Sequence, residues 1–106
     1  MTEQEDKLQQ LQAMEQNVTN LLMQKQQIQG KLTETDSALK EMKGKQQVYR
    51  IIGNIMVLSD TAAVQKELDE NRNLLQIRLK SIEKQEEKFR ERAKKLQDDI
   101  LSSMKK

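Results

Sequence analysis

The ionisable side chains set narrow limits on the chemistry that this chain can perform. Its 106 residues include 19 Lys and Arg and 17 Asp and Glu, but no Cys and no His. The sequence therefore lacks thiol nucleophiles, disulfides, imidazole acid–base catalysts and the usual zinc ligands. It also lacks the G-x-x-x-x-G-K-[ST] loop that binds nucleotide phosphates. We expect a protein that is not an enzyme and that has no cofactor and no metal site.

The charge pattern also argues against nucleic acid or a membrane as the partner. The formal net charge is only +2, and Tyr49 and Phe89 are the only aromatic residues. The lysines near the C-terminus are interspersed with Asp98 and Asp99, without aromatic residues for base stacking, so a basic nucleic-acid binder is the least favoured alternative. No apolar run approaches the roughly 18 residues of a membrane span, and the polar N-terminus does not resemble a signal peptide. We expect a cytoplasmic protein.

Apolar residues recur at heptad spacing in two stretches of similar length, which is typical of a coiled coil. The first stretch is interrupted at Lys25 and Thr35 and the second at Arg72 and Glu86, and these polar residues could fix the register. The pattern predicts helices over 1–43 and 61–104 that pair within the chain as an antiparallel coiled coil. The seam positions are Leu11, Met14, Val18, Leu21, Ile28, Leu32, Leu39 and Met42, then Leu68, Leu75, Leu79, Ile82, Phe89, Ala93, Leu96 and Ile100.

Two registers of this coiled coil are compatible with the heptads, with facing residues whose numbers sum to 107 or to 114. The first places Val18 opposite Phe89 and Met14 opposite Ala93, whereas the second places Lys25 opposite Phe89. We favour the first register, because bulky residues then face small ones and Lys25 avoids the aromatic layer.

The periodicity changes between the two helical stretches. Short β-branched and aromatic runs, 48–52 and 55–58, flank Gly53-Asn54, a pair that suits a two-residue hairpin turn. The sequence therefore predicts a β-hairpin over 47–59. Its expected pairs are Ile52 with Ile55, Ile51 with Met56, Arg50 with Val57, and Tyr49 with Leu58.

This hairpin would be apolar on both faces, and Arg50 is its one charged residue in the two runs. An isolated two-stranded hairpin is marginally stable in water, and its edges remain open to pairing. We therefore expect other subunits to cover it with similar strands; a hairpin folded down as a local cap on the helices is the alternative. The residues predicted to mediate this assembly, called the hairpin set below, are Val48, Tyr49, Ile51, Ile52, Ile55, Met56, Val57 and Leu58.

Three segments resemble the β-type subunit of prefoldin, an ATP-independent chaperone family. They are Leu-Thr-Glu-Thr-Asp-Ser-Ala-Leu-Lys-Glu-Met at 32–42, Val-Tyr-Arg-Ile-Ile-Gly-Asn-Ile-Met-Val at 48–57 and Leu-Lys-Ser-Ile-Glu-Lys-Gln-Glu-Glu at 79–87. The resemblance implies a single prefoldin-like domain over 1–106 with a mainly α fold, in which two long helices of an antiparallel coiled coil are joined by one β-hairpin. It also implies a hexamer of two α-type and four β-type subunits, whose hairpins merge into β-barrels.

Members of this family bind unfolded proteins at the tips of their coiled coils and pass them to a group II chaperonin. The resemblance therefore places client binding at the free helix ends. We expect Leu8, Leu101 and Met104 to be exposed, whereas closure of the coiled coil explains the other three residues at least as well. A structural tether or adaptor without client-holding activity is the alternative function. The candidate client-binding residues, called the tip set below, are Leu8, Leu11, Met14, Ile100, Leu101 and Met104.

Overall fold

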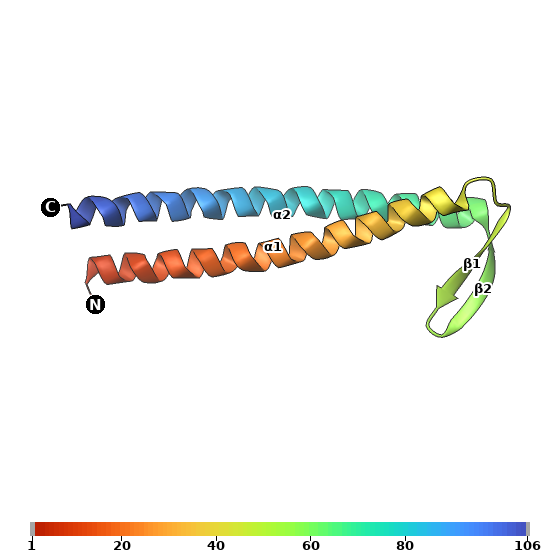
Figure 1. The fold of residues 1–106 in the computed structure, drawn as a ribbon, viewed down its shortest axis with the longest axis horizontal. Helices are drawn as coiled ribbons and strands as arrows, with labels where there is room; N and C mark the ends of the chain where they lie inside the picture. Colours follow the sequence, from red (N-terminus) through yellow and green to blue (C-terminus); the bar gives the residue numbers. More distant parts are fainter. Residues whose placement is uncertain (1, 106) are drawn as a thin grey trace. The chain divides into compact units, whose positions relative to one another are not determined.

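Along the chain, one long helix precedes and another follows a two-stranded antiparallel sheet in the computed structural model, which describes residues 2–105 (Figure 1). The elements are α1 (Glu3–Met42), β1 (Gln47–Ile52), β2 (Ile55–Asp60) and α2 (Thr61–Met104). The mainly α fold class predicted from the heptads and the central hairpin is therefore confirmed. Residue 1, with which the first predicted helix begins, lies outside the described residues.

The described residues form two compact units, and each helix contributes to both. One unit contains residues 2–27, with the first part of α1, and residues 79–105, with the last part of α2; the other is Ile28–Arg78, which includes the whole hairpin. We call them the terminal unit and the hairpin unit. The prediction that residues 1–106 form a single domain stays a prediction.

A thin apolar stripe holds each unit together. In the terminal unit Leu21 and Ile82 are buried, and in the hairpin unit Ile28, Met42 and Val64 are buried. Four of these five residues are predicted seam positions. The fifth, Val64, was not predicted to lie in the seam. Each such side chain contributes about 1.5–3 kcal/mol when it leaves water. Because many other seam residues are only half-buried, these few positions carry much of the packing energy.

Local signals set both ends of α1. At its start the backbone N–H of Glu5 donates to Thr2 Oγ1 at 3.2 Å, so the Thr2 hydroxyl satisfies a free helix amide. At its end Gly44 has a φ of +78°, and the Lys45 N–H donates to the Met42 carbonyl at 3.1 Å. A glycine in this left-handed conformation terminates a helix and lets the chain turn into β1.

The hairpin has the predicted register: Ile52 lies opposite Ile55, Ile51 opposite Met56, Arg50 opposite Val57, and Tyr49 opposite Leu58. Gly53 has a φ of +60°, and no non-glycine residue among 2–105 has a positive φ. This combination identifies a type II′ turn, with glycine at its first central position and Asn54 at its second. The turn therefore fixes which side chains share each face of the sheet.

Candidate functional site

The hairpin presents a large apolar surface to solvent. Of the eight residues in the hairpin set, Val48 is half-buried and the other seven are between 39% and 75% exposed. Contiguous exposed apolar surface of this kind marks an interaction site. The alternative in which the hairpin packs down as a local cap does not describe this structure, because the strands remain open to solvent.

The two faces of the hairpin differ in their relation to α2. One face carries Tyr49, Ile51, Met56 and Leu58, each more than half exposed. The opposite face carries Arg50, whose Nη2 donates to Oε1 of Glu67 on α2 at 2.8 Å. This ion pair ties β1 to the helix within the hairpin unit. The face without a charge is therefore the more open surface for a partner.

The terminal unit contains all six residues of the tip set. Leu8, Leu101 and Met104 are 47%, 51% and 68% exposed, in agreement with the exposure expected from the sequence. Leu11, Met14 and Ile100 are half-buried. Within this unit the free ends of α1 and α2 lie at the same end (Figure 1). The structure therefore brings the six residues to one region of the unit, although their role in client binding stays a prediction.

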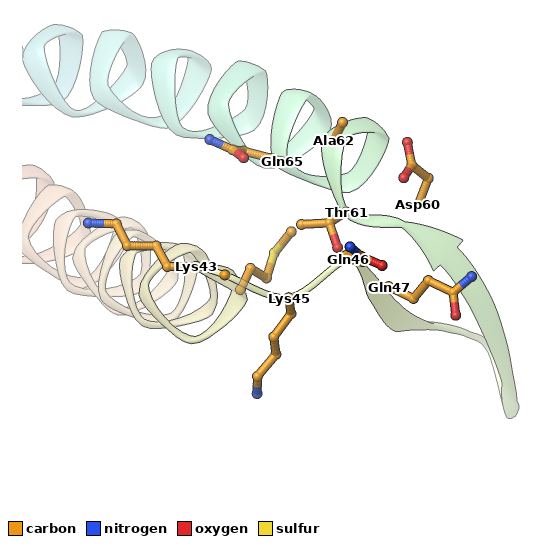
Figure 2. Close-up of a pocket in the computed structure, with 10 residues that line it drawn as sticks. Lys43, Lys45, Gln46, Gln47, Asp60, Thr61, Ala62 and Gln65 are labelled. Carbon is orange, nitrogen blue, oxygen red and sulfur yellow. The ribbon is translucent and has the colours of Figure 1, made fainter.

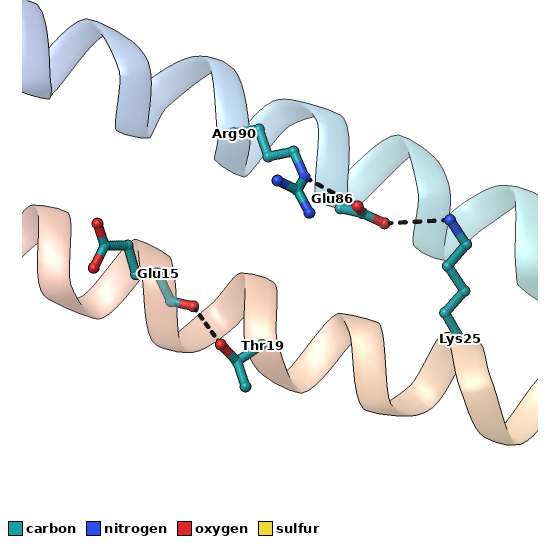
Figure 3. Close-up of polar contacts among 5 residues, drawn as sticks. All are labelled: Glu15, Thr19, Lys25, Glu86 and Arg90. Atoms are coloured by element: carbon teal, nitrogen blue, oxygen red, sulfur yellow. Dashed lines mark hydrogen bonds and ion pairs between the residues drawn. The ribbon is translucent and has the colours of Figure 1, made fainter.

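A charged layer interrupts the seam of the terminal unit (Figure 3). Lys25 Nζ lies 3.7 Å from Oε2 of Glu86, and Arg90 Nε lies 3.0 Å from Oε1 of the same carboxylate. The Glu86 side chain is only 13% exposed, and each of its two oxygens has a cation partner. The heptads showed where Lys25 and Glu86 interrupt the seam, but sequence reasoning missed that the two residues pair. The opposite charges of Lys25 and Glu86 were the feature of the sequence from which this pairing could have been predicted.

The other polar seam residues also have partners. In the hairpin unit Arg72 Nε lies 2.9 Å from Asp36 Oδ1, and the Thr35 hydroxyl donates to the Lys31 carbonyl at 2.8 Å. Arg72 therefore has an ion-pair partner on α1, and Thr35 bonds to the backbone of its own helix.

The two ion pairs that join α1 to α2 differ in the sum of their residue numbers, which describes the register of the coiled coil. Lys25 and Glu86 sum to 111, midway between the two predicted registers, whereas Asp36 and Arg72 sum to 108, close to the favoured one. Long side chains reach along the helix axis, so such pairs do not assign the apolar layers. The register that places Val18 opposite Phe89 stays a prediction.

A polar cavity of about 610 Å³ lies where α1 ends and α2 begins (Figure 2). Lys43, Lys45, Asp60 and Thr61 are among the residues that line it. Figure 2 shows the two lysine side chains pointing away from Thr61 rather than converging on one point. This arrangement does not resemble an anion-binding or catalytic site.

Among the residues that the structure describes, no group of three or more Asp and Glu side chains is arranged to hold a metal ion. Neither α1 nor α2 contains, within 2–105, an apolar segment long enough to span a membrane. The cytoplasmic location stays a prediction.

Comparison with known proteins gives one family. A model of the prefoldin subunit family matches residues 5–106. A prefoldin subunit beta of Methanothrix thermoacetophila is 37% identical over 94% of this chain and 86% of its own length. One from Archaeoglobus fulgidus is 35% identical over 86% of this chain and 81% of its own length. The crystal structure of the prefoldin beta subunit from Thermococcus strain KS-1 superposes with a TM-score of 0.89 at 31% identity, covering 97% of this chain and 93% of that one.

Proposed function

Because the chain belongs to the prefoldin subunit family, we propose that it is a β-type subunit of an ATP-independent chaperone that holds unfolded proteins and delivers them to a group II chaperonin. The observation that carries the proposal is the hairpin, whose seven exposed apolar side chains lie between two coiled-coil arms. Exposure of this apolar surface to water is unfavourable, and assembly with other subunits would remove it.

The hairpin set is the proposed assembly surface. Two α-type and four β-type subunits join their hairpins into β-barrels, which pair the open strand edges and bury one face of each hairpin inside the barrel. Burial of each Ile, Leu or Met side chain there contributes about 1.5–3 kcal/mol. Several such residues per subunit supply enough free energy to offset the entropy lost on association.

The tip set is the proposed client-binding surface. The exposure of Leu8, Leu101 and Met104 supports this role, since an unfolded chain presents apolar side chains that need apolar cover. Met104 also has a flexible thioether that adapts to many sequences. Each arm offers only a small patch, so one contact is weak, and affinity comes from several arms holding one client at high effective concentration.

Reconstitution with an α-type prefoldin subunit tests the proposal. The mixture should form a hexamer by mass measurement and should suppress aggregation of a denatured client without ATP. Met56→Lys should prevent assembly while the isolated chain stays helical, because Met56 is 65% exposed before assembly. A well-folded chain that ignores both the α-type subunit and the client would contradict the proposal.

Trimming residues 1–10 and 99–106 separates a chaperone from a structural tether or adaptor. A chaperone subunit should lose client protection but keep its assembly, since the hairpin is untouched. A tether should show no client-holding activity to lose. The triple variant Leu8→Ser, Leu101→Ser, Met104→Ser tests the same surface without shortening the helices. Met23→Ser is its matched control, because Met23 is 58% exposed and lies outside the tip set.

A further inference from the structure

An apolar cavity of about 550 Å³ lies on the side of the coiled coil in the hairpin unit, apart from the hairpin and the helix ends. From α2 it is lined by Asn71, Leu74, Leu75, Ile77 and Arg78, and from α1 by Lys31, Glu34 and Thr35. We call it the Leu74 cavity. It is a groove open to solvent rather than an enclosed pocket.

Pairing of the two helices explains only one of the three apolar residues of this cavity. Leu75 is a seam residue and is half-buried, but Leu74 and Ile77 lie outside the seam and are 61% and 64% exposed. Two large aliphatic side chains one helical turn apart therefore face solvent on an otherwise polar part of α2. Most of each side chain is therefore left in water within the described structure.

The size of this surface decides what could occupy it. A stable protein–protein interface buries about 800 Å² on each partner and involves about 20–30 residues a side. Eight residues line the Leu74 cavity, and three of them are apolar. The cavity is therefore too small to hold a second folded subunit by itself, but it can accept one or two apolar side chains of an extended segment.

The rim of the cavity suits an extended segment for a second reason. An extended chain carries backbone N–H and C=O groups between its side chains, and these need hydrogen-bond partners. The Asn71 amide both donates and accepts, the Arg78 guanidinium donates, and the Glu34 carboxylate accepts. The lining includes charges of both signs, from Lys31, Arg78 and Glu34, so it does not demand a strongly charged ligand.

We propose that the Leu74 cavity is a second client-binding site, which takes apolar side chains of an unfolded polypeptide in extended conformation. The proposal rests on the proposed chaperone function and adds to it a second contact with the client, partway along the coiled coil. A weak site suffices there, because every arm of the assembly repeats it and the contacts act together on one client.

The test uses the hexamer reconstituted with an α-type subunit and a permanently unfolded probe, reduced and carboxymethylated α-lactalbumin. Leu74→Gln/Ile77→Gln removes the apolar contacts and keeps helix propensity, since glutamine is a good helix former. Met23→Gln is the matched control, an exposed apolar residue outside the cavity. The double variant should weaken probe binding about three- to tenfold, equivalent to about 0.7–1.4 kcal/mol, while the control binds like the unsubstituted hexamer.

A second measurement reports on the site directly. The chain contains no cysteine, so Ile77→Cys allows an environment-sensitive dye to be attached at this one position. Its emission should shift towards that of an apolar environment when the probe binds, including in hexamers trimmed of residues 1–10 and 99–106. The same dye at Met23→Cys should not shift.

Two results would overturn the proposal. In one, the unsubstituted hexamer binds the probe, but Leu74→Gln/Ile77→Gln has no effect and the dye at position 77 does not respond. In the other, the double variant fails to assemble, which would make the cavity a subunit contact. Failure of the unsubstituted hexamer to bind any unfolded probe would instead contradict the chaperone function itself, and the two failures are thus distinguishable.

Discussion

Lys25 Nζ lies 3.7 Å from Glu86 Oε2, which joins a seam-position cation of α1 to a seam-position anion of α2. The Lys25 side chain is 28% exposed and that of Glu86 is 13% exposed, so water screens the pair less than it screens a surface pair. Removal of Glu86 leaves the Lys25 ammonium without its partner, whereas removal of Lys25 leaves Glu86 paired with Arg90 alone.

A double-mutant cycle on this pair should reveal the coupling. We expect Lys25→Met and Glu86→Gln to show an interaction free energy of about 0.5–1 kcal/mol, measured by urea denaturation with circular dichroism at fixed protein concentration. Glu3–Lys7 is the control pair, because the Glu3 side chain is 88% exposed. Its coupling should be near zero, and equal coupling in the two pairs would contradict the role of burial.

Glycine substitutions should act in opposite directions at two positions. Gly30 lies within α1, and a Cβ added there meets nothing within 4 Å, so Gly30→Ala should stabilise the chain by about 0.5–1 kcal/mol. Gly53 has a φ of +60° in the turn, so Gly53→Ala should destabilise the hairpin by about 1 kcal/mol or more. Thermal denaturation measures the first effect and hexamer dissociation the second. Destabilisation by Gly30→Ala would show that the open space at this position is occupied in the protein.

Truncation of a buried and an exposed leucine on the same helix should differ several-fold in cost. Leu21 is 7% exposed, so Leu21→Ala should lower the free energy of unfolding by about 2–3 kcal/mol. Leu8 is 47% exposed, so Leu8→Ala should cost less than about 1 kcal/mol. Urea denaturation of the isolated chain compares the two. Similar costs would mean that Leu8 is packed and unavailable to clients.

Loss of the Arg50–Glu67 ion pair should affect assembly more than stability. Both side chains are about two-fifths exposed, so Arg50→Met should lower the free energy of unfolding by less than about 1 kcal/mol. Because the pair ties β1 to α2, its loss should let the hairpin move and should increase dissociation of the hexamer several-fold, as measured by mass against dilution. Arg92→Met, at an exposed position of α2, should change neither quantity. Unchanged dissociation of the Arg50→Met hexamer would show that the pair does not position the hairpin.

The elements of this fold could be predicted because each depends on local signals. Heptad spacing marked both helices, and Gly53-Asn54 fixed the hairpin register residue by residue. Pairing across the coiled coil could not be predicted as well, because one heptad repeat fits several offsets of the arms. The partnership of Lys25 with Glu86 depended on that offset and was missed.

The candidate sites also differ in whether the sequence alone could predict them. The hairpin set and the exposed members of the tip set followed from apolar residues with no partner in the heptads. Leu74 and Ile77 met the same criterion, since both lie outside the seam, yet their significance became clear only with the cavity that α1 helps to form. A site built by two helices requires their relative placement, which single-helix periodicity does not provide.

The seven exposed apolar side chains of the hairpin set also constrain how a cell can make this protein. Until a partner arrives, each new copy carries two β-edges beside bare isoleucine and methionine, which is the composition of an aggregation-prone segment. We therefore expect production in excess of the proposed partners to yield misassembled oligomers rather than a reserve of free subunits. Balanced synthesis of the partner chains is therefore an expected requirement. It follows from the exposed hairpin, which is one two-residue turn and the strands on either side of it.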